Sequence, residues 1–451
     1  METTPQTRPR RGDQLELTID RLAHGGAGVA RSDGFVVFVR GAVPGDRVLA
    51  EITKSKRSFG EADALELLEP SADRIEPLAA HPGAPWQVLP YERQLSEKED
   101  QVRDALARLG GFADPPVEAI LPAAEPLRYR NNVEYSFGED DEGGLVLGFH
   151  HPGRFDLIDD VSLDVLASER VDEIREVVKA WCRVEGLTAW DRLDQRGLLR
   201  NLVVREGRRT GQVQVRVVTS PGSSFRVNEL AAATPADGFL WTRAGGVGES
   251  TRDGETELVK GAAYLEEELA GLRFRISPDA FFQTNTEMAE RLYGSAAELA
   301  GLSGRERVLD LFCGIGTIAL VLALDAAEVF GVEIVEGAVA DAIENARLNG
   351  IDNAQFFAGD VRLAMRPLLE RSGRPDVVVV DPPRAGLSQK VVRRVLEADA
   401  SRIVYISCNP TTLAPNARQM VDAGYELRTV RPVDMFPQTP HIECVALLER
   451  A

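Results

Sequence analysis

The pattern of apolar and polar positions changes twice along the chain. Over residues 12–70, short runs such as LELTIDRL alternate apolar and polar positions between Gly-rich or Pro-containing turns. This period of two predicts short β-strands, and five of them in so short a segment favour a small closed barrel. Residues 84–275 are mixed. YERQLSEKEDQVRDALARLG predicts a helix, and alternating runs such as GQVQVRVVT indicate an antiparallel sheet.

From residue 276 onward, short apolar strands alternate with helical stretches. The predicted strands are RVLDLFCG, EVFGVEIV, AQFFAGD, PDVVVVDPP and SRIVYISC, with helices such as AVADAIENARLNG and QKVVRRVLEAD between them. This alternation predicts a parallel, doubly wound sheet, whose ligands bind at the carboxyl ends of its strands. The predicted fold class is therefore α/β: a Rossmann-like domain over 276–451, preceded by an OB-like β-barrel over 1–72 and a central α+β domain over 84–275.

Composition describes an ordinary globular protein. The 451 residues are 44% hydrophobic and 27% charged. No apolar run approaches the roughly 18 to 20 residues of a membrane span, and the polar N-terminus lacks the apolar segment of a signal peptide. We therefore expect a cytoplasmic monomer with no membrane partner. The four cysteines are scattered, without a CxxC pair, which argues against a disulfide framework and against a cysteine-built metal or iron–sulfur site.

The charge is unevenly distributed. A net charge of −19 counts against a nucleic-acid partner, because phosphate binding requires Lys and Arg. Residues 1–60, however, hold 10 basic and 7 acidic residues, against 42 and 64 in the remainder. This charge difference indicates that the basic N-terminal segment and the acidic remainder of the chain have different roles.

A glycine-rich loop follows the first strand of the last domain. DLFCGIGT, residues 310–317, includes Gly314 and Gly316 in a G-x-G-x-x-A pattern, and Glu333 ends the next strand. Glycines let the backbone approach an adenosine-bearing ligand, and the carboxylate can bind ribose hydroxyls. NAD and S-adenosylmethionine both fit. Asp310, which could meet a cationic methionine head, favours S-adenosylmethionine, as does the absence of a catalytic domain after the loop.

The fourth predicted strand ends in VDPPRAGL, residues 380–387, where two prolines make a rigid shelf after Asp381. Asp381 and the two prolines are similar to the (D/N)PP(Y/F) loop of amino-group methyltransferases. This similarity also favours S-adenosylmethionine over NAD as the cofactor. Those enzymes stack their target on the aromatic residue, whereas Arg384 stands here. Methylation of an amino group is therefore disfavoured.

Cys408 ends the fifth predicted strand. A lone cysteine near a strand is more often an inert core residue than a reactive one. Near a methyl donor, however, a thiolate has a specific use: it adds to C6 of uracil, so that C5 becomes nucleophilic and can take a methyl group, and removal of the C5 proton then expels the cysteine. Glu443, at the start of the last predicted strand, is the candidate base, because partial burial would raise its pKa.

These runs resemble a known family. SPDAFFQTNTEMAERLY, VLDLFCGIGT, GVEIVEGAVADAIENARLN, VDPPRAGL, YISCNPTTLA and VDMFPQTPHIECVALL are similar, in order and spacing, to the uracil-C5 RNA methyltransferases that form 5-methyluridine in tRNA and rRNA. HGGAGVAR, VFVRGAVPGDRV and KSKRSFG resemble a TRAM domain, an RNA-binding barrel.

The resemblance implies a tRNA or rRNA substrate and S-adenosylmethionine as cofactor. It also assigns roles to individual positions. Cys408 would be the nucleophile and Glu443 the general base. The implied cofactor-binding residues are Gln283, Phe312, Glu333 and Asp381, with Asp360 reaching the adenine.

The chain departs from the family pattern in places. Many relatives hold an iron–sulfur cluster in a Cys-rich run before the YERQL-type helix. AAHPGAPWQVLPYERQL contains no cysteine, and Asp164 stands near the fourth ligand position, so we expect neither a cluster nor any other metal. RNN replaces an Arg-Asn-Lys run. Pro415 and Asn416 replace an Arg-Asp pair and weaken the expectation of a helix after Cys408. Two alternatives stay open: a catalytically inactive RNA-binding adaptor that retains the nucleotide-binding fold, and a NAD-dependent enzyme.

Overall fold

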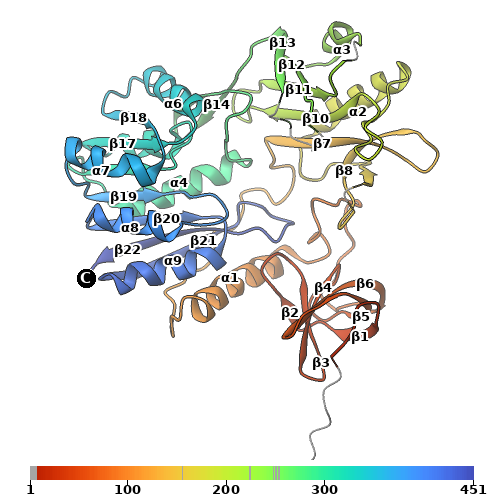
Figure 1. Cartoon of the computed structure of the whole chain (residues 1–451), viewed down its shortest axis with the longest axis horizontal. Coiled ribbons are helices and arrows are strands. Elements are labelled where there is room, and N and C mark those ends of the chain that lie inside the picture. The colour runs from red at the N-terminus through yellow and green to blue at the C-terminus, as the bar shows by residue number, and fades with distance from the viewer. Residues whose placement is uncertain (1–7, 155, 223–224, 247, 249–250, 252–253) are drawn as a thin grey trace, which may run out of the picture.

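The computed structural model describes residues 8–154, 156–222, 225–246, 248, 251 and 254–451, so the first seven residues of the predicted 1–72 barrel lie outside it. Figure 1 shows a barrel at one end, a central sheet domain, and a layered C-terminal domain. Helix α1 lies between the barrel and the C-terminal domain.

The N-terminal barrel has six strands among the described residues, in the order β1-β5-β6-β4-β3-β2. They are β1 (Gln14–Thr18), β2 (Arg21–Leu22), β3 (Gly28–Ser32), β4 (Phe35–Arg40), β5 (Arg47–Ser55) and β6 (Phe59–Glu69). Leu17, Val37 and Ile52 pack in its interior, and their neighbours along each strand point outward. LELTIDRL, predicted as one strand, divides into β1 and β2, because the Ile19 N–H donates to the Asp46 carbonyl before β5 whereas the Asp20 N–H donates to the Val29 carbonyl of β3.

Helix α1 (Tyr91–Arg108) follows the barrel, and the central domain comes after it. The central sheet has the order β13-β12-β11-β10-β7-β8-β9 and is covered by two helices. Its strands are β7 (Asn132–Glu139), β8 (Leu145–His150), β9 (Ile158–Asp160), β10 (Leu199–Glu206), β11 (Val213–Thr219), β12 (Gly238–Arg243) and β13 (Glu255–Gly261), and its helices are α2 (Glu169–Val184) and α3 (Val227–Ala233). The predicted antiparallel pairing holds between β7, β8, β10 and β11, while β11 and β12 pair in parallel.

The C-terminal domain confirms the predicted doubly wound α/β fold. Its sheet has the order β18-β17-β16-β19-β20-β22-β21, and only β22 runs against its neighbours in the described sheet. The strands are β16 (Arg307–Leu311), β17 (Glu328–Glu333), β18 (Ala354–Ala358), β19 (Val377–Val380), β20 (Arg402–Ser407), β21 (Tyr425–Val433) and β22 (Glu443–Arg450). The helices are α4 (Thr286–Ala300), α5 (Thr317–Ala323), α6 (Glu336–Leu348), α7 (Val361–Ser372), α8 (Gln389–Glu397) and α9 (Pro410–Asp422). Helices cover both faces of the sheet, so the central strands are apolar throughout.

Helix α9 forms after Cys408 in spite of Pro415, which lies inside it. Asn409 caps its N-terminus by accepting a hydrogen bond from the Thr411 N–H. The Asn416 side chain accepts from the Leu387 N–H at 2.9 Å and donates to the Leu387 carbonyl at 3.0 Å. The unusual Pro-Asn pair therefore keeps the helix and ties it to the loop after β19.

Side-chain packing crosses the predicted domain limits. Val102 and Leu106 of α1 lie in the same apolar cluster as Leu413 of α9. The hairpin of β14 (Leu265–Leu269) and β15 (Leu272–Ile276) packs with α4 and the core of the C-terminal domain. Helix α1 and the β14–β15 hairpin, both predicted as parts of the central domain over 84–275, therefore contribute apolar side chains to the C-terminal core. Among the described residues, no helix combines the length and apolar character that crossing a membrane requires.

Candidate active site

The carboxyl ends of the central strands bring three predicted residues to one edge of the sheet. Ser407 of β20 pairs with Cys444 of the antiparallel β22. Cys408 is the residue after β20 and Glu443 is the first residue of β22, so both lie beside the last pair of this ladder, and the charge of Glu443 contributes to the raised pKa of Cys408. Asp381 follows β19, which lies beside β20.

The electrostatics of this edge are unusual. Burial raises the pKa of Asp381 to about 7. Burial also raises the pKa of Glu443 well above its ordinary value, and the nearby Asp381 adds to the shift. The pKa of Cys408 rises to about 11, mainly through burial and then through Glu443 and Asp381, while Arg384 opposes the shift. Three acidic groups thus share a site that disfavours their charged forms.

Asp310 lies beneath this edge, within β16. The residue is fully buried, and the backbone N–H of Ala319 is near enough to favour its ionised form, although neither carboxylate oxygen meets the geometry of a hydrogen bond within the described structure. Burial raises its pKa well above the ordinary value and Asp381 adds to the shift, although the backbone N–H of Ala319 opposes it. A buried carboxyl group without a well-formed hydrogen bond is the kind of group that a cation placed nearby would stabilise.

The glycine loop after β16 makes a cradle of strained backbone. Phe312 has a φ of 67°, a value uncommon outside glycine, and Gly314 and Gly316 have φ values of 54° and 83°. A Cβ at Gly316 would lie 3.0 Å from the Phe356 ring and 3.1 Å from the Ala342 side chain, so close packing also requires glycine there. Strain of this kind is found where a loop is shaped for a ligand.

Two carboxylates stand beside the cradle. Glu333, at the end of β17, accepts hydrogen bonds from the Gly314 N–H at 3.2 Å and the Val335 N–H at 2.9 Å, which orient it toward the loop. Asp360 caps α7 and pairs with the Arg362 guanidinium, which holds the pKa of Asp360 at about 2. Together with the buried carboxyl group of Asp310, the cradle and Glu333 fit a cationic, adenosine-bearing cofactor.

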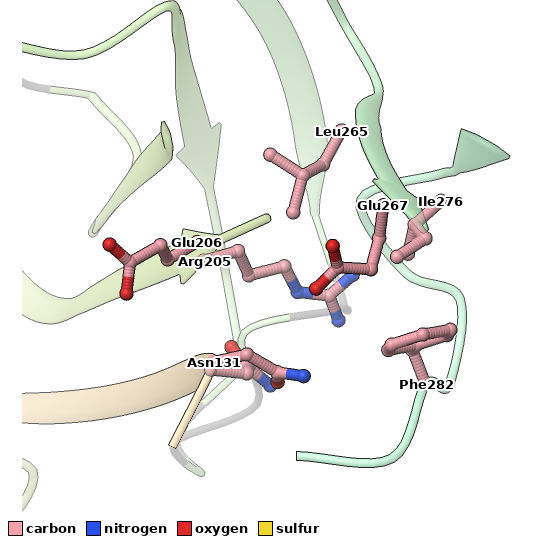
Figure 2. A pocket seen from close by; sticks show the side chains of 8 residues that line it. Asn131, Arg205, Glu206, Leu265, Glu267, Ile276 and Phe282 are labelled. Carbon is pink, nitrogen blue, oxygen red and sulfur yellow. The ribbon is translucent and has the colours of Figure 1, made fainter. Parts of the chain in front are cut away.

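Gln283 is held by the central domain. The Asn131 side chain donates to the Gln283 carbonyl at 2.9 Å, and the Arg205 guanidinium donates to the carbonyls of Ser277 and Ala280 at 3.1 and 3.0 Å. Asn131 and Arg205 also line a cavity of about 10 Å³, which has room for one water molecule. Figure 2 shows Asn131 and Arg205 converging on this junction beside Glu267. The RNN run, at Asn131, therefore supports the segment that carries Gln283.

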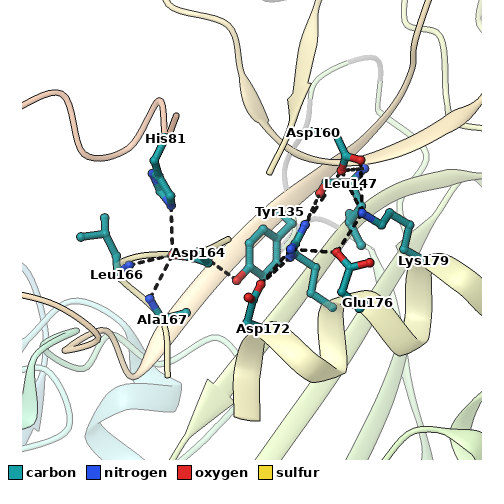
Figure 3. Close-up of polar contacts among 11 residues, drawn as sticks. His81, Tyr135, Leu147, Asp160, Asp164, Leu166, Ala167, Asp172, Glu176 and Lys179 are labelled. Carbon is teal, nitrogen blue, oxygen red and sulfur yellow. Dashed lines mark hydrogen bonds and ion pairs between the residues drawn. The ribbon is translucent and has the colours of Figure 1, made fainter. Parts of the chain in front are cut away.

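The cysteine-free run between the barrel and α1 forms a buried polar contact. His81 Nε2 lies 3.0 Å from Asp164 Oδ1, and the Tyr135 hydroxyl donates to Asp164 Oδ2 at 2.7 Å. Figure 3 shows Asp164 at the centre of these contacts. Its Oδ1 also accepts from the N–H groups of Leu166 and Ala167. Within the described residues, no group of three or more His, Cys, Asp or Glu side chains is placed to hold a metal ion.

Two contributors to the site were not predicted from the sequence. The buried Tyr293 of α4 lies close enough to Asp381, Glu443 and Asp310 for their charges to raise its pKa, after burial, well above the ordinary value. The barrel also lies next to the site: a Cβ at Gly26 would lie 2.9 Å from the Pro440 side chain, and burial and then Arg384 lower the pKa of His24. Tyr293 ends the SPDAFFQTNTEMAERLY run, but no local motif marks either residue as part of a site.

Comparison with known proteins agrees with this geometry. A family model described as tRNA (Uracil-5-)-methyltransferase matches residues 250–451, and a TRAM domain model matches residues 8–65. An uncharacterised RNA methyltransferase of Halalkalibacterium halodurans is 38% identical over 97% of each chain. Another from Chlorobaculum tepidum is 39% identical, over 99% of this chain and 98% of its own.

The chain belongs to the uracil-5 RNA methyltransferase family. It is also similar to the crystal structure of Pyrococcus abyssi tRNA (uracil-54, C5)-methyltransferase in complex with S-adenosyl-L-homocysteine, with 28% identity, a TM-score of 0.78, and coverage of 96% of this chain and all of that one. The predicted family, the TRAM domain and the S-adenosylmethionine-dependent fold are thereby confirmed, which disfavours a NAD-dependent enzyme. The roles of individual site residues in this methyltransferase stay predictions.

Proposed function

We propose that this protein transfers a methyl group from S-adenosylmethionine to C5 of a uridine in tRNA or rRNA through a covalent bond between Cys408 and C6 of the base. One observation carries the proposal. Cys408 follows β20 and Glu443 begins β22, beside the last pair of their antiparallel ladder, and Asp381 and the glycine cradle follow the neighbouring strands β19 and β16. A nucleophile, a base and a cofactor loop therefore meet in one place.

In the proposed reaction, Cys408 and Glu443 act in successive steps. The Cys408 thiolate adds to C6, and the electrons of the C5–C6 double bond move onto the O4 side of the ring as an enolate. When bound, S-adenosylmethionine would supply the methyl group that C5 attacks, with S-adenosylhomocysteine as the leaving group, and a sulfonium charge that would favour the ionised form of Asp381. Glu443 then takes the C5 proton, the double bond re-forms, and the Cys408 thiolate leaves.

The fit to the cofactor follows from residues of this chain. Glu333 would accept hydrogen bonds from the ribose hydroxyls, and Phe312, Gly314 and Gly316 would line the adenosine site, while Asp360 would reach the adenine. Gln283, Asp381 and Asp310 would bind the methionine end in this proposal.

The RNA must present the uridine unstacked. A base within a helical stack cannot bring C6 to a thiol at a strand end, so the uridine comes from a single-stranded loop or is turned out of its stack. The TRAM barrel suits this step, because its residues 1–60 hold 10 basic and 7 acidic residues in an otherwise acidic protein, and the charge of Arg384 at the site helps to lower the pKa of its residue His24.

The function is tested by incubating the purified protein with methyl-labelled S-adenosylmethionine and bulk tRNA and rRNA, followed by nucleoside analysis. We expect label in 5-methyluridine, with none from the Cys408→Ala variant. Label in another nucleoside would overturn the proposed chemistry. Tight RNA binding without any transfer would instead favour the inactive adaptor.

A second variant tests the covalent route. In Glu443→Gln, addition and methylation can proceed, but the C5 proton remains and Cys408 cannot leave. We expect a methylated protein–RNA adduct that migrates as a slow band on a denaturing gel and disappears in the Glu443→Gln, Cys408→Ala double variant. Normal turnover by Glu443→Gln would assign the base role to another group.

A further inference from the structure

The loop over residues 434–442 joins β21 to β22 and leads directly into Glu443. Side chains from distant segments hold its backbone. Asn285 Nδ2 donates to the Met435 carbonyl at 3.0 Å, and the Tyr129 hydroxyl donates to the Pro437 carbonyl at 3.0 Å. The chain just before Glu443 is therefore fixed mainly from outside.

Helix α1 supplies the largest group of these contacts. Tyr91, Gln94 and Lys98 are spaced so that they lie on one face of the helix. Lys98 Nζ lies 2.5 Å from Asp434 Oδ1 and donates to the Phe436 carbonyl at 3.0 Å. The Tyr91 hydroxyl donates to Asp434 Oδ2 at 2.7 Å.

A reciprocal pair of hydrogen bonds continues this contact toward Glu443. Gln94 Nε2 donates to Gln438 Oε1 at 2.8 Å, and the Gln438 N–H donates to Gln94 Oε1 at 2.9 Å. The Gln438 carbonyl in turn accepts from the Trp86 N–H at 3.0 Å. Gln438 has a φ of 65°, so its backbone holds a conformation that surrounding contacts must maintain.

The burial of these groups argues for a role in geometry. The side chains of Lys98 and Asp434 are completely buried, and burial lowers the pKa of Lys98 although Asp434 opposes the shift. Buried ion pairs add little net stability compared with apolar residues of the same volume, whereas they do restrict how two segments can meet. Here the Lys98–Asp434 pair holds α1 in one position against the loop that leads into Glu443, the proposed base.

We propose that the α1 face formed by Tyr91, Gln94 and Lys98 positions Glu443 for removal of the C5 proton. These three are positioning residues that act through Asp434 and Gln438, and the inference rests on the proposed role of Glu443. Displacement of a reacting group by about 1 Å can cost on the order of 100-fold in rate. Loosening this contact should therefore slow proton removal more than the earlier addition of Cys408 or the methyl transfer.

The variant Gln94→Met tests this directly, because methionine is close in size and cannot make the reciprocal bonds. Gln101→Met is a matched control: Gln101 is also a buried glutamine of α1, two turns further on, and its side-chain amide has no hydrogen-bond partner within the described structure. Each purified variant is supplied with tRNA, rRNA and S-adenosylmethionine, and the turnover number, the cofactor dissociation constant and the fraction of protein in the covalent adduct are measured.

For Gln94→Met we expect a turnover number lower by about tenfold, unchanged cofactor affinity, and an adduct fraction at least about fivefold above wild type. Gln101→Met should match wild type in all three. Gln438→Met removes only the bond from Gln94 Nε2 to Gln438 Oε1 of this pair and keeps the backbone N–H of Gln438 as a donor, so its effect should be in the same direction as that of Gln94→Met but smaller. Tyr91→Phe, a smaller change, should shift the adduct fraction in the same direction if Gln94→Met does not fold.

The outcomes separate two failures. If wild type forms no 5-methyluridine and Glu443→Gln traps nothing, the proposed function itself is wrong. If wild type turns over and Glu443→Gln traps the adduct, but Gln94→Met and Tyr91→Phe lose activity without any rise in adduct, then the α1 face supports the fold and not the position of Glu443.

Discussion

Along the carboxyl edge of the C-terminal sheet, the acidic side chains at β17 and β18 have a different electrostatic environment from those at β19 and β22. At β17 and β18 the carboxylates of Glu333 and Asp360 accept hydrogen bonds from backbone N–H groups, and Asp360 also pairs with Arg362. At β19 and β22 the carboxyl groups of Asp381 and Glu443 are desolvated, and each pKa is raised. The half of the edge at β17 and β18 holds its carboxylates by N–H hydrogen bonds before any ligand arrives, while the half at β19 and β22 disfavours ionised acids.

The difference indicates that the half at β17 and β18 is suited to binding a ligand, and the half at β19 and β22 to proton transfer. A carboxylate already oriented by N–H groups can accept ribose hydroxyls with little rearrangement. A base for carbon, by contrast, needs a pKa closer to the working pH than an exposed carboxylate provides. The glycine cradle and the antiparallel strand pair create these two environments within one sheet edge.

The largest expected effect tests two cysteines on this edge. Cys408→Ala should lower methyl transfer by at least about 10³-fold, as expected when a covalent nucleophile is removed. Cys313→Ala is the matched control, since Cys313 is buried beside the cradle and packs its sulfur against Gly331. We expect Cys313→Ala to retain activity within a few-fold of wild type, measured as labelled methyl incorporation. Comparable losses in both variants would show that the site is sensitive to packing rather than to the Cys408 thiol.

The sequence predicted the positions along this edge well, because each is marked by a local pattern. Apolar runs that stop at Glu333, Asp381 or Cys408 identify strand ends, and a parallel sheet necessarily gathers them. Helix α1 was predicted for the same reason, from its apolar spacing and the glycine after it. Helix α7, in contrast, went unpredicted, since Pro367 lies within it.

Contacts between distant segments could not be predicted in the same way. Gln94 and Gln438 are separated by 344 residues, and neither belongs to a chemical motif. Tyr293 and His24 approach the site only because α4 and the barrel pack where they do. The sequence also did not reveal that β14, β15 and α1, all predicted within residues 84–275, pack with the C-terminal core. That packing depends on tertiary contacts, which a local pattern does not encode.

A smaller effect should appear in stability when Asp381 is changed to Asn. The folded carboxyl holds its proton up to a pKa of about 7, whereas the ordinary value is 3.8. The folded state therefore binds the extra proton between these values, and stability contributed by this group is lost as pH rises through that window. Asparagine does not titrate, so the variant should be more stable than wild type at high pH.

The expected gain in the free energy of unfolding is larger at pH 8.5 than at pH 5.5 by about 1 to 2 kcal/mol, since partial exposure of Asp381 to water reduces the full linkage value. Urea unfolding without cofactor at the two pH values measures it. The same variant should lose methyl transfer. An equal gain at both pH values would mean that Asp381 is ionised in the folded protein throughout this range.

The binding half of the edge is tested by Glu333→Ala. Hydrogen bonds to a charged group contribute about 1.5 to 3 kcal/mol each, so the dissociation constant for S-adenosylmethionine should rise by about 10- to 100-fold. Calorimetric titration measures it, and alkylation of Cys408 should be unaffected because Glu333 is not among the groups that shift its pKa. Unchanged cofactor affinity would place the ribose elsewhere.

The smallest effect concerns the reactivity of Cys408 in the free protein. The structure describes all four cysteines, and three are buried while Cys408 is partly exposed, so iodoacetamide should label Cys408 first. Because its pKa is raised to about 11, the thiolate fraction and the labelling rate should climb about tenfold per pH unit from pH 7 to pH 10. Mass spectrometry of the labelled peptide measures the rate. A plateau below pH 9 would show that Arg384 outweighs burial and the two acids, and that the thiol is already activated before cofactor and RNA bind. A steady climb would mean that activation comes with the ligands, as the contrast between the two halves of the edge implies.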